Sequence, residues 1–134
     1  MQTLVLEEFE IDEILFADSA EQKNALLDGL KRLPKQSMTV GFFGQDPEAK
    51  AYAAEFKNVF ESAGFSVVRL EGFLVFDTAF GLEVIVYDSS ATNNEIGIGI
   101  QKAFLSAGFE VRFLTNSNKM QPAISFNVHA KPPN

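Results

Sequence analysis

An internal repeat constrains the fold of this 134-residue chain more than any other sequence feature. When the sequence is shifted by 44 positions, residues 40–70 align with residues 84–114 without a gap. Both segments contain Phe-x-Ser-Ala-Gly-Phe-x-Val-x-x-Leu, starting at Phe60 and at Phe104. Ancestral duplication and convergence on one βαβ pattern both explain this match. Either origin predicts two similar units, each running strand, helix, strand.

The first unit is predicted to contain strands at 38–43 and 66–70 with a helix between them. Asp46 is a favourable N-cap, and Pro47 suits the first helical position because its missing N–H would be unpaired there. Gly64 is expected to end the helix in the left-handed conformation. Apolar residues at helical spacing predict the buried face of this helix: Tyr52, Phe56, Val59, Phe60 and Ala63.

The second unit follows the same pattern, with strands at 82–87 and 110–114. Residues 92–95 (Thr-Asn-Asn-Glu) have the form of a capping box, and Gly108 is expected to end the helix. The predicted buried face comprises Ile96, Ile100, Ala103, Phe104 and Ala107.

Two predicted elements lie outside the repeat. A capping box at 19–22 opens a helix that Pro34 ends, with Leu26, Leu27, Leu30 and Leu33 on one face. Residues 124–129 alternate in polarity and predict a half-exposed strand of the antiparallel kind. Ile124, Phe126 and Val128 are expected to face inward, and Ser125, Asn127 and His129 outward.

These elements predict an α/β fold (an α+β sandwich) with the order α-β-α-β-β-α-β-β and a mixed sheet. A ferredoxin-like two-layer sandwich and a small Rossmann-like three-layer sheet both fit. In the three-layer alternative, the helix at 19–33 covers the second face of the sheet. We expect an acidic leader at residues 1–18 and a single domain at 19–134.

The charge distribution argues against two classes of partner. The formal net charge is −7, residues 1–21 hold seven acids and no base, and residues 22–134 hold eleven of each sign. A neutral body lacks the clustered cations that bind nucleic acid or an anionic membrane. The leader is interpreted either as a solvated segment or as a partner-binding one.

No catalytic residue, metal site or cofactor is predicted. The chain has no cysteine, and His129 is its only histidine. No G-x-S-x-G or nucleotide-binding glycine motif is present. No apolar run is long enough to span a membrane, and the acidic start does not fit a signal peptide.

Two segments are candidate sites for a ligand, because each follows a strand and precedes a helix N-terminus that attracts anions. The alternative is plain helix capping. The candidate residues for a small anion or nucleotide are Gly44, Gln45, Asp46, Asp88, Ser89, Ser90 and Thr92.

Two other segments are candidate contact sites for a protein partner. The linker at 71–81 is unusually apolar for a loop, and it either folds onto the core or forms a pocket or oligomer contact. Two glycines inside the predicted helix of the second unit allow close approach of another backbone, from this chain or from a second one. The candidate contact residues are Phe73, Phe76, Phe80, Gly97 and Gly99.

Several stretches together resemble a set of uncharacterised bacterial proteins. They include 19–22, 30–34, 38–43, 46–53, 63–67 and 81–84, together with the closing Ile-x-Phe-x-Val-x-Ala-Lys-Pro at 124–132. The resemblance covers about residues 14–133 and carries no activity or functional residue. In those proteins a similar domain follows transmembrane helices and a charged coiled coil. The resemblance implies that this chain is the soluble, cytoplasmic end of a membrane-anchored protein. The chain is then either a piece of such a protein or a free-standing relative of it.

The sequence therefore favours a non-enzymatic binding or interaction module that self-associates or binds a protein partner. The alternative is a sensor or enzyme for a small anion or nucleotide, using a crevice formed by residues 44–46 and 88–92.

Overall fold

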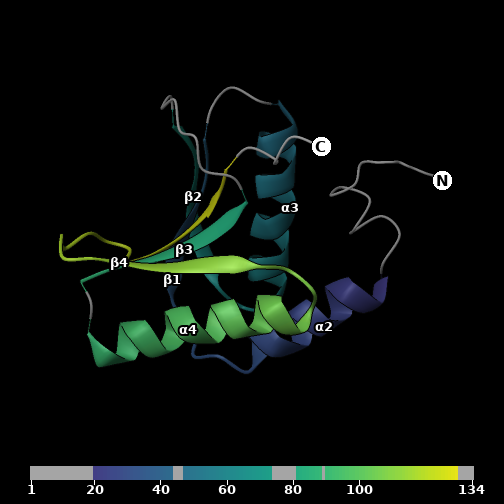
Figure 1. The fold of residues 1–134 in the computed structure, drawn as a ribbon, viewed down its shortest axis with the longest axis horizontal. Coiled ribbons are helices and arrows are strands. Elements are labelled where there is room, and N and C mark those ends of the chain that lie inside the picture. Colours follow the sequence, from purple (N-terminus) through teal and green to yellow (C-terminus); the bar gives the residue numbers. More distant parts are fainter. Residues whose placement is uncertain (1–19, 44–46, 74–80, 89, 130–134) are drawn as a thin grey trace.

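The computed structural model describes residues 20–43, 47–73, 81–88 and 90–129. Its elements occur in the predicted order, which confirms the α/β class (Figure 1). In chain order they are α2 (Ala20–Lys31), β1 (Ser37–Phe43), α3 (Pro47–Ser62), β2 (Ser66–Phe73), β3 (Leu82–Tyr87), α4 (Ala91–Ser106), β4 (Val111–Asn116) and β5 (Ile124–Val128).

The five strands form one mixed sheet in the order β2-β1-β5-β3-β4. Strand β1 is parallel to β2 and to β5. Strand β3 is parallel to β4 and antiparallel to β5. Strand β5 therefore lies at the centre of the sheet and joins the two βαβ units.

The two βαβ units share their helix length and their helix ends. Helices α3 and α4 each have 16 residues, and their bounds differ by the predicted 44 positions. Phe60 and Phe104, at equivalent positions, are fully buried. Gly64 and Gly108 follow the helices with φ of 102° and 95°, the left-handed region that a side chain disfavours. Both glycines end their helices as predicted.

Aromatic rings place α3 and α4 on the same face of the sheet. Phe56 of α3 and Phe104 of α4 lie 5.4 Å apart between ring centroids. Both rings also pack against Phe126 of β5, at 5.3 Å and 4.7 Å. Since one strand residue contacts both helices, the main core lies between these two helices and one face of the sheet.

Helix α2 packs against the other helices rather than against the second face of the sheet (Figure 1). A Cβ atom built on Gly29 of α2 would lie 2.9 Å from Ala103 Cβ of α4. Leu26 and Leu30 of α2 are fully buried in the same core. Of the two alternatives, the one in which this helix covers the second face of the sheet is therefore not the observed arrangement.

The exposure predicted for β5 is also wrong. Ser125, Asn127 and His129 are buried, although their alternation with apolar residues predicted a half-exposed strand. The reason is that β5 lies between β1 and β3, and Phe43 of β1 and Glu83 of β3 pack against its polar face. The alternation instead places apolar residues toward the helices and polar residues on the opposite face.

No helix within the described ranges is both long enough and apolar enough to cross a lipid bilayer.

Candidate functional site

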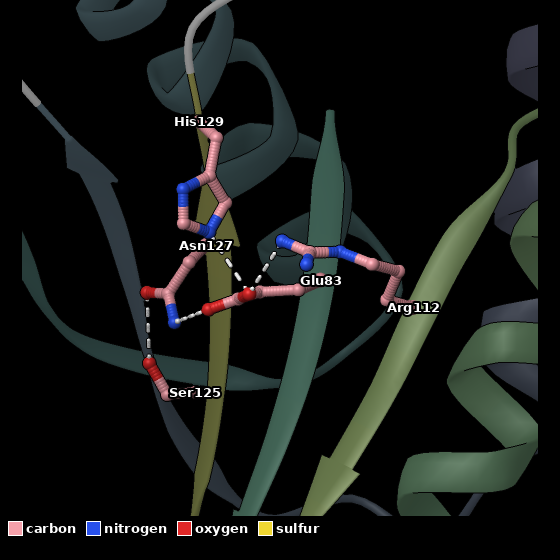
Figure 2. Close-up of polar contacts among 5 residues, drawn as sticks. All are labelled: Glu83, Arg112, Ser125, Asn127 and His129. Atoms are coloured by element: carbon pink, nitrogen blue, oxygen red, sulfur yellow. Dashed lines mark hydrogen bonds and ion pairs between the residues drawn. The ribbon is translucent and has the colours of Figure 1, made fainter. Parts of the chain in front are cut away.

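A polar cluster lies on the face of the sheet opposite to α3 and α4. Because Phe126 points toward the helices, its neighbours along β5 point away from them. Figure 2 shows the cluster, which draws on three adjacent strands and the residue that follows β5. Its members are Glu83, Arg112, Ser125, Asn127 and His129.

Glu83 of β3 is the centre of this cluster. Its Oε1 accepts from Arg112 Nη2 at 2.9 Å and lies 2.9 Å from His129 Nε2. Its Oε2 accepts from Asn127 Nδ2 at 3.2 Å. Glu83 is the direct register partner of Arg112 on β4 and of Asn127 on β5, so the pairing of three strands fixes these contacts. Figure 2 shows the carboxylate between the groups that contact it.

Opposing effects set the pKa of Glu83. Burial raises it, but the hydrogen bond and charge of His129, the Asn127 amide and the Arg112 charge lower it. The lowering effects together prevail, so the pKa lies below its ordinary value. Glu83 is therefore ionised at neutral pH even though its side chain is only 5% exposed.

The rest of the cluster fixes the end of β5. Ser125 Oγ donates to Asn127 Oδ1 at 3.1 Å. The His129 ring stacks on Phe43 of β1, with centroids 4.2 Å apart and planes 7° apart. The His129 backbone N–H donates to the carbonyl of Gly81 at 2.8 Å. These contacts tie β5 to both of its neighbours.

The geometry of the cluster suits structural support rather than catalysis. The His129 side chain is 3% exposed, so solutes have little access to it or to Glu83.

Tyr87, at the end of β3, has a pKa raised by burial and by the negative charges of Glu83 and Glu71. Its hydroxyl is therefore neutral at physiological pH. Within the described ranges, no group of three His, Cys, Asp or Glu residues is placed to hold a metal ion.

The outer edge of β4 is the second feature of interest. Strand β4 pairs with β3 in an uninterrupted register from Val111 to Asn116, and no other described strand pairs with it. Leu114 of β4 is 40% exposed and Leu105 of α4 is 63% exposed. Leu105 also lines a hollow of about 580 Å³ beside the start of β4. A strand edge with exposed apolar side chains is a template for pairing with another chain.

The outer edge of β2 differs from that of β4. The pairing of β1 with β2 shifts between Met38 and Thr39, so Val68 is an extra residue in β2. Arg69 and Glu71 form an ion pair on this strand, at 3.2 Å. Bulges and charges are the features by which proteins protect sheet edges, and β2 has both.

Two of the predicted ligand residues near α4, Asp88 and Ser90, contact the first turn of this helix. Ser90 is its N-cap, and the Ser90 hydroxyl accepts from the backbone N–H of Asn93 at 3.1 Å. The predicted capping box at Thr92 is therefore wrong, since Thr92 lies inside the helix. Asp88 has a φ of 54°, and its carbonyl accepts from Ser90 N at 2.7 Å and from Asn93 Nδ2 at 3.1 Å. Ser89 lies outside the described residues.

The strand directions do not bring the two predicted halves of the crevice together. Gly44, Gln45 and Asp46 lie outside the described residues. The preceding strand β1 ends at Phe43 and runs parallel to β5, whereas β3 runs antiparallel to β5. The carboxyl ends of β1 and β3 are therefore at opposite ends of the sheet.

Of the predicted contact residues, the structure describes the surroundings of the two glycines but not the phenylalanine side chains. Phe76 and Phe80 lie outside the described residues, and so does the side chain of Phe73. A Cβ atom on Gly97 would lie 2.6 Å from Val86 Cγ2 and 2.7 Å from Phe113 Cε1, and one on Gly99 would lie 2.5 Å from Leu33 Cδ2. Both glycines thus accommodate side chains of this chain, which is the internal-packing alternative.

The sequence analysis did not single out Glu83, Arg112 or Gln101. The side-chain amide of Gln101 donates to the backbone carbonyl of Val111 on β4. A signal for Glu83 and Arg112 was present in the sequence. Glu83 is the only charged residue of β3 and Arg112 the only one of β4, and each is the second residue of its strand. Opposite charges at equivalent positions of two apolar strands of one βαβ unit indicate a cross-strand pair.

A scan against protein-family models and searches of curated proteins and solved structures found no match to this chain.

Proposed function

We propose that this chain is a non-enzymatic interaction module that self-associates through the outer edge of β4. The observation that carries the proposal is this edge, which has a regular register, an exposed leucine (Leu114) and a second exposed leucine (Leu105 of α4) beside the start of the strand. In the proposed dimer, the β4 strands of two copies pair antiparallel across a twofold axis. Each copy then contributes the same surface, as in most homodimers.

Charge supports a second copy as the occupant of this edge. Arg112 is the only charged residue of β4, and Glu83 of the same chain pairs with it at 2.9 Å. Two β4 edges can therefore meet without bringing unpaired like charges together. The extra residue and the ion pair of β2 make that edge the less favourable one.

The proposal also includes the context that the resemblance implies, in which this domain is the soluble end of a membrane-anchored protein. A cytoplasmic location is part of the same proposal. The alternative, a single crevice for an anionic ligand, has less support because the carboxyl ends of β1 and β3 lie at opposite ends of the sheet.

Charged substitutions at the two sheet edges test the proposal. Leu114→Lys places a charge on the β4 edge, and Val68→Lys places one on the β2 edge at a side chain of similar exposure, 47% against 40%. Leu114→Lys should raise the dimer dissociation constant at least about tenfold, or by roughly 1.4 kcal/mol. Val68→Lys should leave it unchanged. Native mass spectrometry over a range of concentrations measures both constants.

The results separate three cases. Loss of the dimer in Leu114→Lys, with the dimer retained in Val68→Lys, supports pairing through β4. Equal dimerisation of both variants and the unsubstituted chain rejects β4 as the contact. A bare monomer of the unsubstituted chain at every concentration rejects self-association.

A further inference from the structure

We infer that Gln101 of α4 caps the β4 edge and thereby limits the length over which a second copy can pair with it. This inference rests on the proposed self-association and adds a device that regulates it. The cap is a hydrogen bond from the Gln101 side-chain amide to a backbone carbonyl of β4. Pairing over the full strand requires this bond to be exchanged for one from the partner.

The contact itself is well formed. Gln101 Nε2 donates to the carbonyl oxygen of Val111 at 2.7 Å, which is short for an N–H···O hydrogen bond. Val111 is the first residue of β4, so the helix satisfies an acceptor at the start of this strand. A strand that lies at the edge of its sheet presents such acceptors to any chain that docks there.

The surroundings of the contact leave it accessible to a partner. Gln101 and Val111 both line the hollow of about 580 Å³, together with Leu105 and Arg112. Leu105 is the most exposed of the large apolar side chains in the described ranges. An added strand therefore meets the capped carbonyl and an apolar contact in the same place.

The cap has a consequence for the length of pairing. Within the described ranges, no side chain caps a backbone carbonyl of β4 from Phe113 to Asn116 in this way. A second copy can add a strand along this part at once. Extending the pairing to Val111 means that the Gln101 amide must first leave the carbonyl. The cap thus weakens association without abolishing it.

Removal of the amide donor tests this inference. Gln101→Met keeps the length of the side chain, and Gln101→Ala shortens it; neither can donate to Val111. Since a hydrogen bond of this kind contributes about 0.5–1.5 kcal/mol net, both variants should lower the dimer dissociation constant roughly two- to tenfold. Lys102→Ala, at an exposed neighbour on the same helix, should leave the constant unchanged. Sedimentation equilibrium measures the constants, and circular dichroism checks folding.

The outcomes distinguish failure of the cap from failure of the proposed function. Tighter association of both Gln101 variants, abolished again by adding Leu114→Lys, supports the cap. If the unsubstituted chain dimerises through β4 and both variants match it, the cap is rejected and the proposed function stands. Tighter association of Gln101→Met alone also rejects the cap, because the gain then comes from added apolar surface.

Discussion

Glu83 shows how a single buried charge organises a sheet. A carboxylate removed from water loses several kcal/mol of hydration, and only close partners offset that loss. Glu83 has partners on both neighbouring strands, Arg112 on one side and Asn127 with His129 on the other. A shift of either neighbouring strand by one residue would remove the partners of the carboxylate on that side. The cluster therefore specifies the register of β3, β4 and β5 as well as stabilising them.

Replacement of Glu83 should change both the stability and its pH dependence. We expect Glu83→Gln to lower the free energy of unfolding at pH 7 by about 2–4 kcal/mol, because His129 and Arg112 lose a charged partner. The folded-state pKa of Glu83 lies below its ordinary value of 4.5. Its contribution to stability is therefore complete above about pH 4.5 and is lost as the pH falls through the folded-state pKa.

Denaturant unfolding from pH 3 to pH 7 measures this effect. The loss of stability on acidification should be smaller in Glu83→Gln than in the unsubstituted chain. Glu61→Gln is the matched control, since Glu61 is an exposed member of an i,i+4 pair with Lys57. Its effect should stay below about 0.5 kcal/mol at every pH. Parallel pH profiles for Glu83→Gln and the unsubstituted chain would refute the central role of this carboxylate.

At the scale of elements, the close approach of α4 to its neighbours depends on two glycines with different surroundings. A methyl group at Gly97 meets Val86 of β3 and Phe113 of β4, whose side chains pack between the helix and the sheet. A methyl group at Gly99 meets the end of the Leu33 side chain, which is only partly buried. Both substitutions gain the same helix propensity, about 1 kcal/mol.

We therefore expect Gly97→Ala to be more destabilising than Gly99→Ala. Overpacking at Gly97 costs about 1–3 kcal/mol, which equals or exceeds the gain in propensity. Gly99→Ala should be neutral or slightly stabilising, because Leu33 can move aside. Thermal unfolding of both variants measures the difference. A more stable Gly97→Ala variant would mean that α4 leaves room for a side chain at this position.

The sequence predicted the helices and strands better than their arrangement, because local signals define an element whereas contacts between distant residues define the arrangement. Helical periodicity, Pro47 and the closing glycines are local signals, and they located both helices of the repeat. The contacts of Asn127 and His129 depend on Glu83, which is distant in the sequence, and on the insertion of β5 between the two units. Alternating polarity describes two different faces, but it does not say whether the polar face meets water or buried charges.

At the scale of the whole molecule, the sheet has two dissimilar edges and one central strand that joins the repeated units. Pairing of two short strands buries little surface, so the proposed dimer should be weak and depend on protein concentration. The cluster around Glu83 keeps β4 in register and neutralises its only charge. The edge that remains is regular, nearly uncharged and flanked by Leu105 and Leu114.

Backbone hydrogen exchange as a function of protein concentration tests this claim most directly. Amides of β4 that point away from β3 should gain protection as the concentration rises, because a partner strand then bonds to them. Amides of β2 should exchange at the same rate throughout. Protection that is independent of concentration in β4, or that increases in β2 instead, would contradict self-association through the β4 edge.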